Sequence, residues 1–209
     1  MTTVCRRSQK GIPLAQVRVE KLVMDTKVLI PFQQNVTALL ESIEDCLTKG
    51  RTIASLILLY SGIDCISALE SGRANRSTFK KWVSDYILRK TPLPCTASDL
   101  YAARCGILHT LSAESELSRQ RKARPIVYAW GNAKPERLAR TAAVLKRQDC
   151  IIHIRELVDG FRRGLADYLE EILRDQKRIL RVQKTAGLWF TNVSTETVDT
   201  FLKLHATGP

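Results

Sequence analysis

The sequence lacks the short motifs that mark several common classes of protein. It has no glycine-rich phosphate loop of the Walker or Rossmann kind, no cysteine pair with zinc spacing and no Gly-x-Ser-x-Gly segment. These absences give no support to a nucleotide-driven motor or to a hydrolase with a serine nucleophile. We therefore expect neither a metal nor a cofactor.

Long apolar runs and a secretory signal are also missing. The apolar stretch without a charge at residues 52–63 has 12 residues, and no uncharged stretch exceeds 13, whereas a membrane span needs about 20. The first residues, "MTTVCRRSQKGIPLAQ", are charged and contain no apolar segment. The six cysteines are widely spaced and fit reduced thiols. These features predict a cytoplasmic protein with no membrane partner.

Acidic residues are few relative to basic ones. The chain has 33 Lys and Arg against 21 Asp and Glu, a net charge of +12 and a pI near 9.7. Residues 119–184 alone contain 17 Lys and Arg and 8 Asp and Glu, so most of the surplus lies in the C-terminal half. Such a surplus attracts polyanions and releases counterions from phosphates. RNA is therefore an expected partner, and an acidic protein is the alternative.

Helical spacing of apolar residues over most of the chain predicts a mostly α fold, a helical bundle in a single domain. Residues 1–30 are basic and weakly patterned, and form an arm or a short strand. Residues 31–112 supply four core helices, of which the first begins at Pro31. The second, residues 51–70, is apolar nearly all round and should be central.

The rest of the domain combines a minor strand element with further helices. Residues 113–134 form a basic loop and the short strand "IVYAWG", and residues 135–209 form C-terminal helices and a tail. Residues 149–180 are expected as one long amphipathic helix that could be interrupted at Gly160 or Gly164. A second strand expected in the tail, residues 188–193, could pair with the first, and the strand element after the fourth helix could instead be a hairpin.

After its first residue, Asp99, the helix "DLYAARCGILHT", residues 99–110, is mostly apolar, with Arg104 and His109 as the exceptions. The segment "TASD" starts it as a capping box. Positions five apart lie roughly 140° apart around a helix and about 7.5 Å along it, so Arg104 and His109 do not share a face. A second helix, or a second copy of this one, would then have to complete a site. In the structural alternative, Arg104 pairs with Asp64 and His109 caps the helix end.

Arg-x4–6-His spacing by itself carries little information. The abundance of arginine gives an expectation of roughly one such match by chance, and the sequence holds two, Arg104 with His109 and Arg147 with His153. We interpret the second as a surface arginine and a packed histidine. The context of the first pair is different, because Gly106 and neighbouring small residues would let another backbone approach its helix closely.

A basic, all-helical chain with an apolar helix reading "DLYAARCGILHT" resembles the HEPN superfamily, chiefly over residues 31–112. This resemblance implies a helical bundle, a homodimer and a metal-independent endoribonuclease of a toxin or defence type, with an antitoxin as a further partner. It also implies that Arg104 holds the phosphate and that His109 transfers protons. Cys105 departs from the family, whose active members often carry a polar residue after the arginine. Some members keep the fold without cleavage, so a non-catalytic module that binds RNA, a nucleotide or an acidic protein is the alternative.

Two further groups of residues surround this motif. Cys105 and His109 lie four apart on one helix face and could form half a metal site, although no second pair of ligands completes it. Tyr128 and Trp130 could stack on bases, or could be buried in their strand. A basic run after the motif helix is predicted to bind RNA phosphates, through Arg119, Arg121, Lys122 and Arg124.

Overall fold

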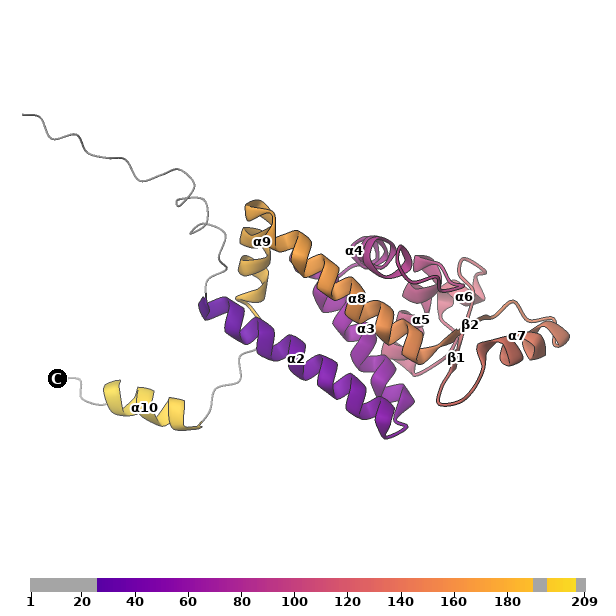
Figure 1. The fold of residues 1–209 in the computed structure, drawn as a ribbon, viewed down its shortest axis with the longest axis horizontal. Helices are drawn as coiled ribbons and strands as arrows, with labels where there is room; N and C mark the ends of the chain where they lie inside the picture. Colours follow the sequence, from indigo (N-terminus) through magenta and orange to yellow (C-terminus); the bar gives the residue numbers. More distant parts are fainter. Residues whose placement is uncertain (1–25, 190–194, 206–209) are drawn as a thin grey trace, which may run out of the picture.

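The structure is a computed structural model of the 209-residue chain, and it describes residues 26–189 and 195–205. Helices make up most of it, and one small two-stranded sheet lies at one side of the bundle (Figure 1). The expected mostly α fold with a minor strand element is confirmed. The elements are α2 (Thr26–Thr48), α3 (Thr52–Ala68), α4 (Arg76–Trp82), the π-helical η1 (Val83–Leu88), α5 (Ala97–Thr110), α6 (Glu116–Arg119), β1 (Ile126–Ala129), α7 (Pro135–Val144), β2 (Cys150–His153), α8 (Ile154–Leu173), α9 (Gln176–Ala186) and α10 (Thr195–His205).

α3 is the central helix, as its apolar character predicts. It packs against α2, α4, α5 and α8, and Leu59 and Ile63 on it are fully buried. Each side chain of this kind stabilises the fold by about 1.5–3 kcal/mol relative to exposure. Ile53, in the first turn of α3, is 56 % exposed and lies outside this core. Apolar as α3 is, none of the described helices has both the length and the apolarity to cross a membrane.

The first helix begins earlier than predicted. α2 already includes Thr26, so Pro31 lies inside the helix rather than at its start. The reason is that the apolar stripe continues before the proline, because Val28 and Leu29 are half-buried against the core. The end of the expected arm, residues 26–30, is therefore helical, and residues 1–25 lie outside the described part of the chain.

The two strands are parallel, and α7 connects them, so they do not form a hairpin. Ile126 of β1 is opposite Cys150 of β2, and the register continues to Ala129 and His153. β1 falls where the sequence predicts a strand. Its partner is β2, however, and not the tail segment 188–193, most of which lies outside the described residues.

The expected long helix over residues 149–180 is wrong at its beginning and near its end. Residues 150–153, "CIIH", form β2, because pairing with β1 lets this short apolar run be buried. His153 then caps α8 by accepting a hydrogen bond from the backbone N–H of Arg155 (3.1 Å). α8 ends at Leu173, and the Asp175 side chain caps the separate helix α9.

α8 is uninterrupted at its glycines, which serve close packing instead. A Cβ at Gly164 would lie 2.7 Å from the carbonyl oxygen of Tyr86 in η1. At Gly160 it would lie 3.1 Å from the Ile87 side chain. Glycine thus allows α8 to approach the backbone of η1 at a distance that any other residue would prevent.

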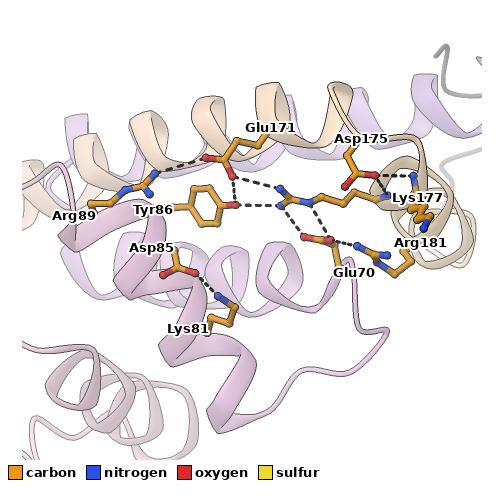
Figure 2. Close-up of polar contacts among 10 residues, drawn as sticks. Glu70, Lys81, Asp85, Tyr86, Arg89, Glu171, Asp175, Lys177 and Arg181 are labelled. Carbon is orange, nitrogen blue, oxygen red and sulfur yellow. Dashed lines mark hydrogen bonds and ion pairs between the residues drawn. The ribbon is translucent and has the colours of Figure 1, made fainter. Parts of the chain in front are cut away.

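A network of charged side chains fastens α9 to the bundle (Figure 2). Arg178 donates two hydrogen bonds to Glu70 (3.1 and 2.8 Å), one to Glu171 (3.3 Å) and one to the Tyr86 hydroxyl (3.1 Å). The Tyr86 hydroxyl donates to Glu171 (2.6 Å), and Arg181 also contacts Glu70 (2.9 Å). α9 is therefore tied to α8, to η1 and to the end of α3.

The carboxylates of this network predict an acid-sensitive fold. Burial tends to raise the pKa of Glu70, but hydrogen bonds and charges from Arg178 and Arg181 outweigh it and lower the pKa. Hydrogen bonding from Tyr86 likewise lowers the pKa of Glu171. A carboxylate whose pKa is lower in the folded than in the unfolded protein stabilises the fold at pH values above its unfolded pKa of about 4.3. This stabilisation is lost as the pH falls through the pKa of the folded protein.

We therefore expect the free energy of unfolding to be nearly level from about pH 7 to pH 5, and to fall below about pH 4.5. Urea unfolding followed by circular dichroism at several pH values measures this. Glu70→Gln should make the decrease shallower, because one of the carboxylates with a lowered pKa is removed. An equally steep decrease in that variant would contradict the role given to Glu70.

Candidate functional site

The candidate site lies at the C-terminal end of α5, and both ends of this helix are capped locally. Thr96 accepts a hydrogen bond from the backbone N–H of Asp99, and the Asp99 carboxylate accepts one from the N–H of Thr96, which is the predicted capping box. Leu111, with a φ of 51°, ends the helix in the left-handed conformation. His109 is thereby placed in the last turn, exposed to solvent.

Arg104 of the predicted pair is fixed by an acid from the central helix. Its Nε lies 2.7 Å and its Nη2 2.5 Å from Oδ2 of Asp64 in α3. The two side chains are only 19 % and 13 % exposed, so the ion pair is largely shielded from solvent. Burial works to lower the pKa of Arg104, but Asp64 outweighs it and raises the pKa. The predicted structural pairing of Arg104 with Asp64 is present.

The same guanidinium also reaches the histidine. Nη1 of Arg104 lies 3.1 Å from Nε2 of His109. The two positions diverge around the helix as expected, but the long arginine side chain spans the gap. The two groups therefore meet within one chain, and the completion of the site by a second helix stays a prediction. Because an arginine can only donate, this contact requires His109 Nε2 to be an unprotonated acceptor.

The small-residue face of α5 is covered by the chain itself. Asp99, Ala102, Ala103 and Gly106 are all buried. A Cβ at Gly106 would lie 2.5 Å from the carbonyl oxygen of Ser112, so the segment directly after α5 occupies this space. The expected close approach of another backbone to Gly106 is therefore present, and this backbone belongs to the chain itself.

Cys105 belongs to no cluster of possible metal ligands among the described residues. It is half-buried, and no group of three or more His, Cys, Asp or Glu side chains within residues 26–189 and 195–205 could hold a metal ion.

The second Arg–His pair does not form a site. Arg147 lies 2.5 Å from the Asp149 carboxylate, while His153 caps α8 and contacts the carbonyl oxygen of Gly131 (3.1 Å). The two side chains therefore have separate partners.

The basic run after α5 divides into anchored and exposed cations. Arg124 donates to Asp99 from its backbone N–H (2.7 Å) and from Nη2 (2.8 Å), and to the carbonyl oxygen of Pro94 (2.9 Å). It thus fastens the run to the N-terminal end of α5. Burial tends to raise the pKa of Asp99, but the hydrogen bonds from Thr96 and Arg124 lower it. Arg119, Arg121 and Lys122 are exposed.

A hollow of about 570 Å³ lies beside this run. It brings Arg121, Lys122 and Arg124 together and adds Lys146 from the end of α7, which sequence reasoning missed. A finer charge count would have found it, because residues 119–147 contain nine Lys and Arg and one acidic residue. Arg119 is not part of the lining. The lining residues are Asp99, Ser118, Arg121, Lys122, Ala123, Arg124, Pro125, Lys146 and Gln148.

The two aromatic residues considered for base stacking differ in exposure. Tyr128 is half-buried in β1, and its hydroxyl is hydrogen-bonded to the Tyr60 hydroxyl in the core. Trp130, just after β1, is 56 % exposed. Only Trp130 has a ring surface open to a partner.

Comparisons with models of known protein families, with curated proteins and with solved structures found no match.

Proposed function

We propose that this chain is a metal-independent endoribonuclease of the HEPN type, with Arg104 and His109 as the reacting groups. The observation that carries this proposal is the 3.1 Å contact between Arg104 Nη1 and His109 Nε2 at the exposed end of α5. A guanidinium and an imidazole held this close can act on one phosphodiester. Asp64 supports them as a positioning residue, because it fixes two other nitrogens of the guanidinium.

In the proposed reaction the substrate itself supplies the nucleophile. His109 Nε2 takes the proton of the 2′-hydroxyl, the 2′-oxygen bonds to the adjacent phosphorus, and the bond from phosphorus to the 5′-oxygen breaks. The 5′-oxygen leaves with the electron pair and takes a proton from a general acid. The products are a 2′,3′-cyclic phosphate and a 5′-hydroxyl. Arg104 donates to a non-bridging phosphate oxygen and stabilises its developing charge.

This chemistry requires the contact between Arg104 and His109 to open before His109 can act. A nitrogen that already accepts a hydrogen bond from Arg104 has no free lone pair for the proton of the 2′-hydroxyl. The guanidinium is planar and rigid, and Asp64 holds its Nε and Nη2, so it is the exposed His109 ring that turns away from Nη1. Nη1 is then free to donate to a phosphate oxygen.

A homodimer would supply the missing general acid. The exposed rim of α5 carries His109, and Leu111 beside it is 65 % exposed. Two copies that meet at this rim, and not at the buried small-residue face, would bring a second imidazole to the leaving oxygen. A single active species with the mass of a monomer in light scattering would contradict this arrangement.

The decisive experiment is an RNA-cleavage assay with the full chain in excess EDTA. We expect cleavage of single-stranded RNA, 2′,3′-cyclic phosphate ends and no cleavage of DNA of the same sequence, because DNA lacks the attacking hydroxyl. Cleavage of DNA, or cleavage that appears only when a divalent metal ion is added, would contradict the proposal. A toxin or defence role would then be tested by expressing the active chain in cells with and without an acidic antitoxin.

The ion pair of Arg104 favours one alternative function. Because Asp64 holds this guanidinium in a largely buried ion pair, the pair could be structural, and the chain could be a module that binds RNA or an acidic protein without cleavage. Binding of RNA that weakens with salt, without any cleavage product, would support this alternative.

A further inference from the structure

The hollow between α6 and the end of α7 has the charge of an anion-binding site. Arg121, Lys122 and Lys146 line it from two separate segments of the chain. No described residue forms an ion pair with any of these three cations. The one acidic residue of the lining, Asp99, is already paired with Arg124. A ligand in the hollow therefore meets three uncompensated positive charges.

The backbone brings two of these cations to the hollow in an unusual conformation. Arg121 and Lys146 have φ values of 56° and 53°, and they are two of the three non-glycine residues with positive φ in the described chain. Each lies at a helix end where glycine is the usual residue, since glycine adopts this conformation without strain. The backbone conformation at positions 121 and 146 favours glycine. The sequence has a basic residue at both positions instead, and both line the hollow.

The hollow and the candidate catalytic residues lie at opposite ends of the same helix, α5. Asp99, in its lining, lies in the first turn of α5, and His109 lies in the last turn. Ten residues of helix separate them by about 15 Å along the axis. One extended polyanion can therefore contact the hollow and the Arg104–His109 pair together.

The lining favours a nucleic acid backbone over a protein surface. It contains only two apolar residues, Ala123 and Pro125, whereas protein interfaces have apolar or aromatic anchors at their centre. Its volume of about 570 Å³ is ample for a phosphate group with part of its sugar. Lysine and arginine together are the residues that contact phosphates.

We propose that this hollow binds the phosphodiester backbone of single-stranded RNA, a few nucleotides away from the bond that is cut. The identity of the polyanion rests on the proposed function, while the binding of a phosphate backbone is measurable without cleavage. Arg121, Lys122 and Lys146 contact the phosphates, and Arg124 acts as a positioning residue through Asp99.

The test measures RNA affinity against salt concentration in the full chain with His109→Ala, so that no substrate is consumed. The hollow variant carries Arg121→Gln, Lys122→Gln and Lys146→Gln. The matched control carries Arg51→Gln, Arg73→Gln and Lys177→Gln, three exposed cations outside the hollow. For single strands, the logarithm of the affinity falls with the logarithm of the salt concentration with a slope of about 0.7 per phosphate contact. The loss of three contacts should therefore make this slope shallower by roughly 2 units in the hollow variant. We expect a 10- to 100-fold weaker affinity, and less than about a threefold change in the control.

Two further measurements separate the remaining explanations. Lys146→Gly should bind RNA more weakly although it raises the melting temperature, because glycine relieves the left-handed backbone. Polyglutamate of equal charge should compete poorly with RNA. Equal loss of affinity in the hollow variant and the control, or equal competition by polyglutamate, would overturn the proposal.

The outcomes also distinguish this proposal from the proposed ribonuclease activity. If the unmodified chain cleaves no RNA but the hollow variant loses RNA affinity, the hollow is supported and the catalytic proposal fails. If the unmodified chain cleaves RNA, and the three hollow substitutions weaken neither RNA binding in the His109→Ala chain nor cleavage in a chain that keeps His109, the catalytic proposal is supported and the hollow is not a binding site.

Discussion

Replacing His109 with alanine is expected to lower the rate of RNA cleavage by roughly 10²- to 10⁴-fold, which is the usual contribution of a general base. The side chain is exposed and its one described hydrogen-bond partner is Arg104, so the fold should be unaffected. Initial rates on a short fluorescent RNA in EDTA measure the effect. Circular dichroism and thermal unfolding check that the variant is folded.

The chain offers a matched control for this prediction. His153→Asn keeps a residue that can cap α8, since asparagine is a favourable N-cap, and it should cleave RNA at the unmodified rate. Arg104→Lys keeps a charge beside Asp64 but loses the forked guanidinium, and should lower the rate at least about tenfold. If His109→Ala cleaves as fast as the unmodified chain, the assignment of the catalytic residues is wrong.

The largest expected effect on stability is that of Arg178→Ala. Arg178 is 19 % exposed and contacts Glu70, Glu171 and Tyr86, and its guanidinium lies 5.6 Å from the centre of the Tyr168 ring. Its removal leaves Glu70 without its main partner and Glu171 without one of its cations. Breaking a fully buried pair costs about 3–5 kcal/mol, so this half-shielded network should cost about 2–3 kcal/mol. For a chain of this size the melting temperature would decrease by about 5–10 °C.

Arg174→Ala is the control for this measurement. Arg174 forms an exposed pair with Glu170, with side chains 74 % and 66 % exposed, and such pairs contribute about 0–1 kcal/mol. Thermal and urea unfolding of both variants should differ clearly. Similar losses in the two variants would mean that the network around Arg178 contributes no more than an ordinary surface pair.

Local patterns in the sequence were sufficient for most of the helices. The spacing of Phe79, Trp82 and Tyr86 predicts a helix that buries this face, and all three are buried in the structure. The capping box at Thr96 and Asp99 predicts the start of α5 correctly. These features depend on residues within about one helical turn of each other, which is why a single sequence reveals them.

Contacts between distant segments could not be predicted in the same way. The run "CIIH" has no helical or strand periodicity of its own, and only its pairing with β1 makes it a strand. The contact of Arg104 with His109 depends on a side-chain conformation that Asp64, 40 residues earlier, helps to fix. The hollow likewise needs Lys146 beside Arg121, which follows from the way α7 connects the two strands.

The network around Arg178 also has a consequence for the order in which the molecule assembles. It joins Glu70 to Arg178 across 108 residues of sequence, so its formation must wait until most of the chain has closed into a loop. The helical hairpin of α2 and α3 requires no such wait, because its residues are close in sequence. We therefore expect α9 to dock on the bundle after the hairpin of α2 and α3 has formed.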